Sequence, residues 1–449
     1  MGKKTVVVIG AGCAGLAATY TLKKAGVDVV AFESSSRPGG RCWNLSSRDG
    51  FTIPIGAGFT ETQWATTHKF VRELGMSTQA HVEKNQRVAF WRDGKKHFIL
   101  KGGPLETLKN LPEMLRFRGL PFKAYPQFVR LGLAMLKYMR RLDPVVRDFD
   151  PLIELGDVSS TEFALKHGGP EILDHLIAPF LGTMVLARPE EVTIAHIIAL
   201  AFLMGGVCVM ENGMGSINAG LYERVKEHVR LSTPVTKVVI EGRQVKGVET
   251  KEGFFEADQV ICATDAVLAR GLIPDLPDTI RKPLETCRYS STYNYIFGLE
   301  KKITPRHFMA TFIPGSEKSL LTTIFDAAGG AMKTAPDGCG LMYAFTAGWY
   351  DNELGRLSED ERRRRVIKET QKFWPEFPDE PLFSECIRFE RAINLESPGQ
   401  FPAIHAFLRH HARDVKGLYL AGEYLFLIAC TEGAFATGEK AANLVLEDL

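Results

Sequence analysis

Three glycines near the start of the chain constrain its fold more than any other feature. They have the spacing G-x-G-x-x-G and are Gly10, Gly12 and Gly15. The run before them, 5–9, consists of β-branched residues and is typical of a strand buried on both faces. The run 13–25, which begins after Gly12 and includes Gly15, is rich in Ala and Leu and predicts a helix, which Gly26 ends. A buried strand that turns through glycines into a helix is the unit from which doubly wound α/β sheets are built.

Such a turn is suited to bind the pyrophosphate of a dinucleotide. The first glycine permits the tight turn, the second lets the backbone approach the phosphates, and the third lets the helix pack close to the sheet. We expect Ala14, in the first helical turn, to share the phosphate contact, because N-terminal N–H groups of a helix face negative charge. A second apolar run over 27–32 ends at Glu33, which is placed to accept hydrogen bonds from an adenosine ribose. An acid there also argues against a 2′-phosphate.

The loop RPGGR over 37–41 adds two arginines beside this turn. We expect Gly40 to let the backbone approach the cofactor and Arg41 to pair with its phosphate. A solvated loop is the alternative. An apolar strand over 51–55 then leads into a bend of sequence GAGF, formed by Gly56, Ala57, Gly58 and Phe59.

Together, the glycine turn, the acid after the second strand, the R-x-G-G-R loop and the G-A-G-F bend resemble the N-terminal signature of one flavin superfamily. This group holds monoamine oxidase, protoporphyrinogen oxidase and phytoene desaturase. The resemblance implies FAD as the cofactor, and it implies that residues 56–59 pass near the isoalloxazine ring.

A second signature of the same superfamily lies at the other end of the chain. A short strand precedes Gly422 and Glu423, and the resemblance implies that Gly422 allows close approach. It also implies that Glu423 accepts hydrogen bonds from the sugar-like part of the cofactor. A helix begins near Cys430, and its positive end is expected to face the flavin and stabilise negative charge there. The residues assigned to this helix start are Glu432, Gly433 and Ala434.

Residues in the middle of the chain are also expected to contact the cofactor. The resemblance implies that Val235 meets adenine and that Ala263 and Thr264 lie near the phosphates, with an ordinary core position as the alternative for Val235. We therefore predict an α/β fold with a Rossmann-type FAD-binding domain, a mixed sheet flanked by helices, an α+β substrate domain and a helical subdomain. The expected segments are 1–80, 231–285 and 392–449 for FAD binding, 81–230 for the substrate and helical domain, and 286–391 for its β-sheet.

The reaction is inferred from where the chain departs from amine oxidases. The run over 179–193 resembles protoporphyrinogen oxidases and desaturases more than monoamine oxidases. Amine oxidases place an aromatic residue just before the last helix, where this chain has Cys430, and the expected strand over 289–299 has no evident lysine. We expect a flavin-dependent oxidoreductase that removes hydride from a C–H bond of a hydrophobic small molecule and forms a C=C bond, with O2 or a quinone as electron acceptor. The alternatives are an amine or amino-acid oxidase, an isomerase that uses FAD without net oxidation, and a non-enzymatic FAD-binding scaffold.

No catalytic residue is evident, but several side chains are candidates for the substrate pocket. Cys430 is interpreted as a small packing residue, since a nucleophilic thiol would need a base that the sequence does not place. For Tyr424 and Phe426 a core position is the alternative. The pocket candidates are Tyr293, Tyr295, Tyr424, Phe426 and Cys430.

Composition bears mainly on partners and location. A net charge of +2 gives no reason to expect nucleic acid, and the eight scattered cysteines and eleven histidines show no metal-binding spacing. No apolar run is long enough to span a membrane, so we expect a cytoplasmic protein. Residues 114–141 contain seven Lys or Arg and no acid. They are either core-facing helices with a solvated basic face or an interfacial patch that contacts anionic membrane or admits a lipophilic substrate. A homodimer and a monomer are both left open.

Overall fold

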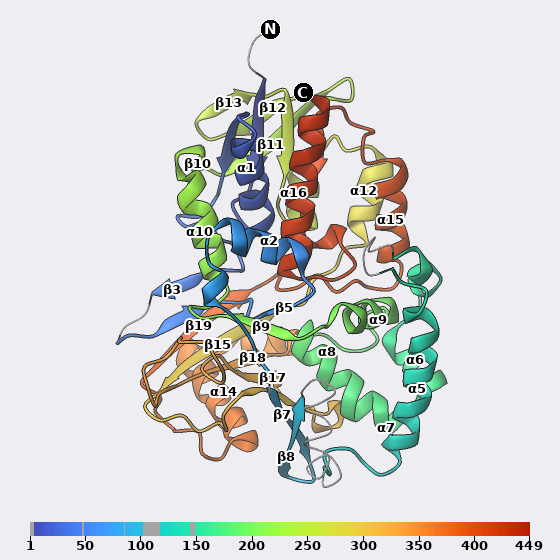
Figure 1. Ribbon diagram of the computed structural model, residues 1–449, viewed down its shortest axis with the longest axis vertical. Helices are drawn as coiled ribbons and strands as arrows, with labels where there is room; N and C mark the ends of the chain where they lie inside the picture. Colours follow the sequence, from blue (N-terminus) through green and yellow to red (C-terminus); the bar gives the residue numbers. More distant parts are fainter. Residues whose placement is uncertain (1–3, 47–48, 85, 102–116, 144–148) are drawn as a thin grey trace.

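Two sheets lie at opposite ends of an elongated molecule, with a group of helices beside the lower one (Figure 1). The computed structural model describes residues 4–46, 49–84, 86–101, 117–143 and 149–449. Within these ranges, no helix combines the length and the apolar character that crossing a bilayer requires.

The predicted strand–turn–helix unit forms the centre of a five-stranded parallel sheet. In spatial order its strands are β10 (Val229–Arg230), β2 (Asp28–Phe32), β1 (Thr5–Ile9), β14 (Gln259–Cys262) and β20 (Leu418–Leu420). Strand β1 is apolar throughout because both of its faces are covered. Val6 and Val8 pack under helices on one face, and Val7 and Ile9 pack against an antiparallel β-layer on the other.

Helices from both ends of the chain, α1 (Cys13–Lys24) and α16 (Thr431–Asp448), cover the first face of this sheet. Helix α10 (Gly215–Val225) packs on α1, and α2 (Ala65–Glu73) packs on α16. Helices α1 and α16 approach so closely that a Cβ atom at Gly438 would lie 2.1 Å from the carbonyl oxygen of Ala14. The second face is covered by β11 (Val235–Glu241), β12 (Gln244–Thr250) and β13 (Gly253–Glu256), with α11 (Ala266–Leu272), α12 (Asp278–Glu285) and α15 (Gln400–His410) beside them.

A seven-stranded mixed sheet forms the second layer. Its strands in order are β19 (Phe383–Phe389), β15 (Thr292–Leu299), β18 (Gly340–Thr346), β17 (Leu321–Asp326), β16 (Phe308–Phe312), β7 (Gln86–Arg92) and β8 (Lys95–Lys101). A hairpin around Asp93-Gly94 joins β7 and β8. Helix α14 (Glu359–Phe373) covers one face of the sheet and begins with a capping box from Ser358 and Glu361. The other face points toward the first sheet.

Short strands and a helical group complete the fold. The short strands are β3 (Asn44–Ser46) with β4 (Thr52–Pro54), and β5 (Thr60–Glu61) and β6 (Ala80–Val82) on either side of β9 (Val207–Met210). The helices are α5 (Ala124–Met139), α6 (Ser160–His167), α7 (Pro170–Ile172), α8 (Ala178–Met184) and α9 (Ile194–Leu203). Ser159 caps α6 by accepting a hydrogen bond from the Glu162 N–H at 3.1 Å.

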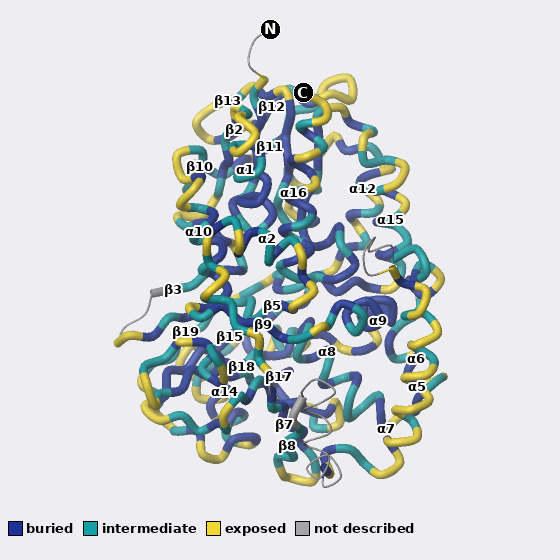
Figure 2. Tube along the Cα trace, in the orientation of Figure 1, coloured by how far each residue is buried: buried dark blue, intermediate teal, exposed yellow. Residues whose placement is uncertain are grey.

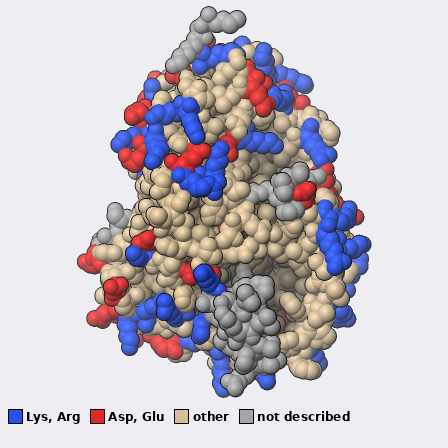
Figure 3. Space-filling view, viewed as in Figure 1, with Lys and Arg blue, Asp and Glu red and all other residues tan. Residues whose placement is uncertain are grey.

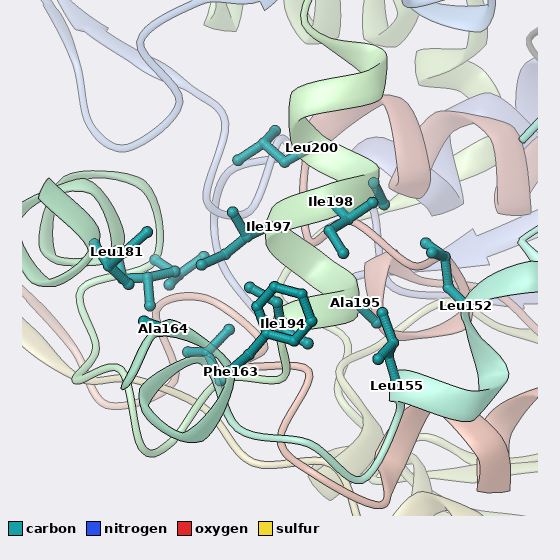
Figure 4. Close-up of a cluster of buried hydrophobic side chains, with 14 of the residues drawn as sticks. Leu152, Leu155, Phe163, Ala164, Leu181, Ile194, Ala195, Ile197, Ile198 and Leu200 are labelled. Carbon is teal, nitrogen blue, oxygen red and sulfur yellow. The ribbon is translucent and has the colours of Figure 1, made fainter. Parts of the chain in front are cut away.

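Helix α9 lies at the centre of this helical group. Figure 4 shows its apolar side chains packed against those of the surrounding elements. Because α9 is apolar on nearly every side, it is buried by neighbours all round rather than along one stripe.

Candidate active site

A cavity of about 750 Å³ opens between the two sheets. It begins at the carboxyl ends of the parallel strands, where the residues that follow β1, β2, β14 and β20 all contribute to its lining. In open α/β sheets this edge is the usual place for a ligand. The cavity extends from there to the inner face of the seven-stranded sheet.

The glycine turn after β1 has the geometry that a phosphate cradle requires. Gly10 has a φ of +97°, a left-handed conformation that favours glycine. A Cβ atom at Gly15 would lie 1.8 Å from the carbonyl oxygen of Gly10, so only glycine lets α1 start this close to the strand. A Cβ atom at Gly12, by contrast, would meet nothing within 4 Å. The backbone of Gly12 therefore borders open space in the cavity, which a bound pyrophosphate would fill.

Glu33 borders the same end of the cavity. Its Oε2 atom accepts a hydrogen bond from the Ala11 N–H at 2.8 Å, and its Oε1 atom accepts one from the Ser35 N–H at 2.8 Å. These bonds hold the carboxylate beside the glycine turn. Its predicted contact with a ribose fits this position and stays a prediction.

Arg41 and Glu423 join the two sequence signatures across the cavity. Arg41 Nη2 lies 2.6 Å from Glu423 Oε1, and Arg41 Nη1 donates to the Ala392 carbonyl at 2.9 Å. Although burial works against its charge, the Glu423 carboxylate raises the pKa of Arg41, which is therefore a permanent cation. The sequence predicted separate cofactor contacts for the two residues, and the structure also pairs them with each other.

Most of the residues predicted from the sequence border this one cavity. They are Gly10, Gly12, Ala14, Glu33, Gly40, Arg41, Gly56, Ala57, Gly58, Phe59, Val235, Ala263, Thr264, Gly422, Glu423, Cys430 and Ala434. A glycine cradle, a permanent cation and a carboxylate beside the turn suit a dinucleotide with a charged pyrophosphate and a ribose.

Glu432 does not face the cavity, contrary to the prediction. Its buried carboxylate turns toward α2, where it accepts hydrogen bonds from the backbone N–H groups of Thr66 at 3.0 Å and Thr67 at 2.8 Å. It therefore caps the α2 N-terminus. Gly433 is also outside the cavity lining, and its N–H donates to Cys430 Sγ at 3.5 Å. A first helical turn presents its side chains in several directions, and only Thr431 and Ala434 border the cavity.

Tyr293 and Tyr295 are also misplaced in the prediction. Both project from the outer face of β15, on the side of α14. The Tyr295 hydroxyl accepts a hydrogen bond from Arg362 Nε at 3.1 Å, and the Tyr293 ring lies between the guanidinium groups of Arg362 and Arg388. The β15 residue that does border the cavity is Thr292.

Tyr424 and Phe426 occupy core positions, which was the alternative interpretation. Tyr424 is buried in the apolar cluster beneath the first sheet. Phe426 packs edge-on against Phe149, with ring centroids 5.9 Å apart. Cys430 does border the cavity, and burial raises the pKa of its thiol well above the usual range. The thiol is therefore protonated near neutral pH, which fits a packing residue.

The far end of the cavity has an apolar wall that sequence reasoning missed. This wall consists of Met184 at the end of α8, Leu186 just after it, and residues on the inner faces of β16, β17 and β18, namely Met309, Phe325, Tyr343 and Phe345. The Tyr343 hydroxyl donates to the Pro54 carbonyl at 2.8 Å. The sequence predicted a β-sheet within 286–391 but not the strand β16, and alternation along the strands could have grouped their inward residues on one face.

Charge is segregated within the cavity. Among the described residues that border it, the charged ones are Glu33, Arg37, Arg41, Asp265 and Glu423. All five belong to the loops at the dinucleotide end. The apolar wall contributes no charged side chain within the described part of the chain.

Comparison with known proteins identifies relatives of this architecture. Mitochondrial protoporphyrinogen oxidase of Nicotiana tabacum is 27% identical over 196 residues, which cover 43% of this chain and 35% of the plant protein. Flavin-containing amine oxidase B of Rattus norvegicus is 22% identical over 383 residues, which cover 82% of this chain and 70% of the rat protein. A crystal structure from Exiguobacterium sp., provisionally described as a protoporphyrinogen oxidase, shares the fold over 100% of both chains, with a TM-score of 0.78 and 18% sequence identity.

The family described as flavin containing amine oxidoreductase matches residues 13–446. The match covers nearly the whole chain and includes both ends of the cavity. The chain therefore belongs to the flavin-containing amine oxidoreductase family and is an FAD-dependent oxidoreductase.

Proposed function

We propose that this enzyme oxidises an uncharged, hydrophobic small molecule by removing hydride from a C–H bond, which leaves a new C=C bond in the product. The observation that carries the proposal is the apolar wall, where the described residues provide no charge to recognise an ammonium or carboxylate group. Relatives include both protoporphyrinogen oxidase and amine oxidase B, so the choice between reactions rests on this wall.

The two ends of the cavity would bind different molecules, the cofactor at one end and the substrate at the other. At one end, the glycine turn, Arg41 and Glu33 would hold the dinucleotide portion of the cofactor. Bound FAD supplies the hydride-accepting centre. At the other end, Phe325, Tyr343 and Phe345 would bury the substrate at roughly 25 cal/mol per Å² of apolar surface removed from water. Exclusion of water also strengthens electrostatic interactions at the reacting carbon.

The second hydrogen of the substrate leaves as a proton, and the wall provides no ionised base to take it. The Cys430 thiol is protonated, and burial raises the pKa of Tyr343 well above its usual value while its hydroxyl donates to Pro54. We infer that this proton passes to water or to a heteroatom of the substrate itself. Polyenes and polycycles without an amine or an ionised carboxylate fit these requirements.

Anaerobic reduction of the bound flavin tests the proposal. The purified holoenzyme is mixed with a panel of porphyrinogens, polyenes, steroids, alicyclic acids and amines, and the flavin absorbance is followed. We expect bleaching by an uncharged member of the panel, and the product should contain one more C=C bond. O2 and a quinone are then added separately to identify the electron acceptor.

Other outcomes would overturn the proposal. Bleaching by amines alone, with ammonia released in air, would make the enzyme an amine oxidase. Turnover of a polyene without bleaching or acceptor consumption would make it an isomerase. Met309→Glu, which places a carboxylate in the wall, should slow bleaching at least tenfold while flavin content is retained, and Met309→Leu serves as its matched control.

A further inference from the structure

Helix α5 exposes large apolar side chains that soluble proteins normally bury. The α5 face consists of Phe122, Tyr125, Phe128, Val129, Leu133 and Leu136, whose exposed fractions range from 37% to 87%. Most of them recur every three or four residues and so share one side of the helix. Figure 2 shows α5 at the edge of the molecule, with exposed residues along it. Single exposed apolar residues are ordinary, but a contiguous row indicates an interaction site.

The α5 face is separate from the side of the helix that contacts the protein. Ala124 and Leu131 are buried, and Met135 and Tyr138 pack into the apolar cluster around α9. Helix α5 is thus apolar on two sides, only one of which is covered within this chain. The uncovered side needs an occupant that offers apolar surface.

A row of cations runs beside the α5 face. Lys123, Arg130 and Lys137 are spaced seven residues apart, which places them on one line along the helix, and all three are exposed. Arg140 is exposed in the following turn. No acid occurs between 117 and 142. Figure 3 shows Lys and Arg gathered along the edge of the molecule where Figure 1 places α5 and α6.

We propose that the α5 face docks on a membrane surface that contains anionic lipid, with the helix lying in the plane of the interface. An apolar row that enters the acyl region beside cations that meet anionic headgroups is the pattern of an interfacial helix. The charges disfavour the rival in which a second copy covers this face, because two such faces would bring like charges together. Residues 114–116, part of the stretch predicted to contact a membrane, lie outside the described residues. The docking does not depend on which reaction the enzyme catalyses.

Flotation of the full-length holoenzyme with lipid vesicles tests the proposal. One vesicle is phosphatidylcholine alone, and the other contains roughly one third phosphatidylglycerol. We expect the enzyme to float with the anionic vesicle, and less so as salt is raised. The variant Phe122→Gln/Val129→Gln/Leu133→Gln should lower the bound fraction at least tenfold. The matched control Val82→Gln/Phe254→Gln/Leu382→Gln alters exposed apolar residues elsewhere and should bind like the wild type.

A second variant separates charge from apolar contact. Lys123→Gln/Lys137→Gln should weaken binding to the anionic vesicle and reduce its salt dependence, while binding to phosphatidylcholine stays unchanged. The proposal is overturned if the wild type floats with neither vesicle or if the control variant loses as much binding as the α5 variant. It is also overturned if light scattering shows that the α5 variant converts a dimer to a monomer, which would assign the face to a second copy. A large fall in thermal midpoint for the α5 variant without a loss of vesicle binding would assign the face to the chain itself.

Discussion

Replacing Glu432 with alanine should destabilise the protein while leaving its affinity for FAD nearly unchanged. The carboxylate is fully buried at the start of α16 and joins this helix to the N-terminus of α2. It accepts hydrogen bonds from the Thr66 and Thr67 N–H groups, and from the Thr67 hydroxyl at 2.9 Å. Alanine would leave the buried Thr67 donor and the partly buried Thr66 donor without this acceptor.

The cost follows from these bonds. A buried donor that loses its partner costs about 1–3 kcal/mol, so two backbone donors give about 4 kcal/mol near the middle of the range. That is a large part of a typical unfolding free energy of 5–15 kcal/mol. Glu432→Gln keeps one acceptor oxygen and most of the volume, and we expect a smaller loss of about 1–2 kcal/mol.

Urea unfolding of the apoprotein, followed by tryptophan fluorescence, measures the loss of stability. Titration of the apoprotein with FAD under conditions where each variant is folded measures the affinity. We expect Glu432→Ala to shift the urea midpoint strongly, with a dissociation constant for FAD within about threefold of the wild type, which is less than 1 kcal/mol. A variant that unfolds like the wild type but no longer binds FAD would refute the reasoning and return Glu432 to the cofactor.

Three further predictions concern the glycine turn, the ion pair and a buried carboxyl. Gly15→Ala should destabilise the apoprotein by about 3 kcal/mol in urea unfolding, because its Cβ meets the Gly10 carbonyl. Gly12→Ala should fold nearly normally but bind FAD more weakly when the apoprotein is titrated with FAD. Glu423→Gln should weaken FAD binding about tenfold, because it removes the negative charge that pairs with the Arg41 guanidinium. Fluorescence titration of the apoprotein with FAD measures this change in affinity. Burial raises the pKa of Asp326, so the stability it provides is present below about pH 3.9 and is lost as the pH rises through its folded pKa. Asp326→Asn should therefore flatten urea-determined stability as the pH rises from about 4, where the slope that Asp326 gives the wild type is at most about 1.4 kcal/mol per pH unit.

Local patterns were sufficient to predict the dinucleotide end of the cavity. The spacing of the glycine turn is imposed by backbone contacts within a few residues, such as the approach of Gly15 to Gly10. The second signature, around Gly422, follows from the same short-range demands at the end of β20. Such constraints are written in consecutive residues, so they can be interpreted without knowledge of the rest of the fold.

The direction in which a side chain points was harder to predict than the type of element that carries it. Alternation along β15 correctly separates its two faces, but it does not say which face meets α14 and which meets the cavity, so Tyr293 and Tyr295 were assigned to the wrong side. The side chain of Glu432 likewise points where α2 happens to begin, and α2 lies more than 350 residues earlier in the chain. Helix α15 was not predicted from its own residues, and its packing against α12 depends on distant parts of the chain.

The arrangement of apolar residues links the reaction chamber to the proposed membrane surface. Met309 in the cavity wall belongs to an apolar cluster with Phe180, and the same cluster includes Phe117 and Leu120. Phe117 and Leu120 directly precede the α5 face, which begins at Phe122. Packed apolar side chains thus connect the cavity wall to the segment that leads into α5, the helix that would lie in the interface. Docking of the α5 face would therefore bring the apolar end of the cavity toward the lipid, which suits a substrate that partitions into the bilayer better than a water-soluble amine.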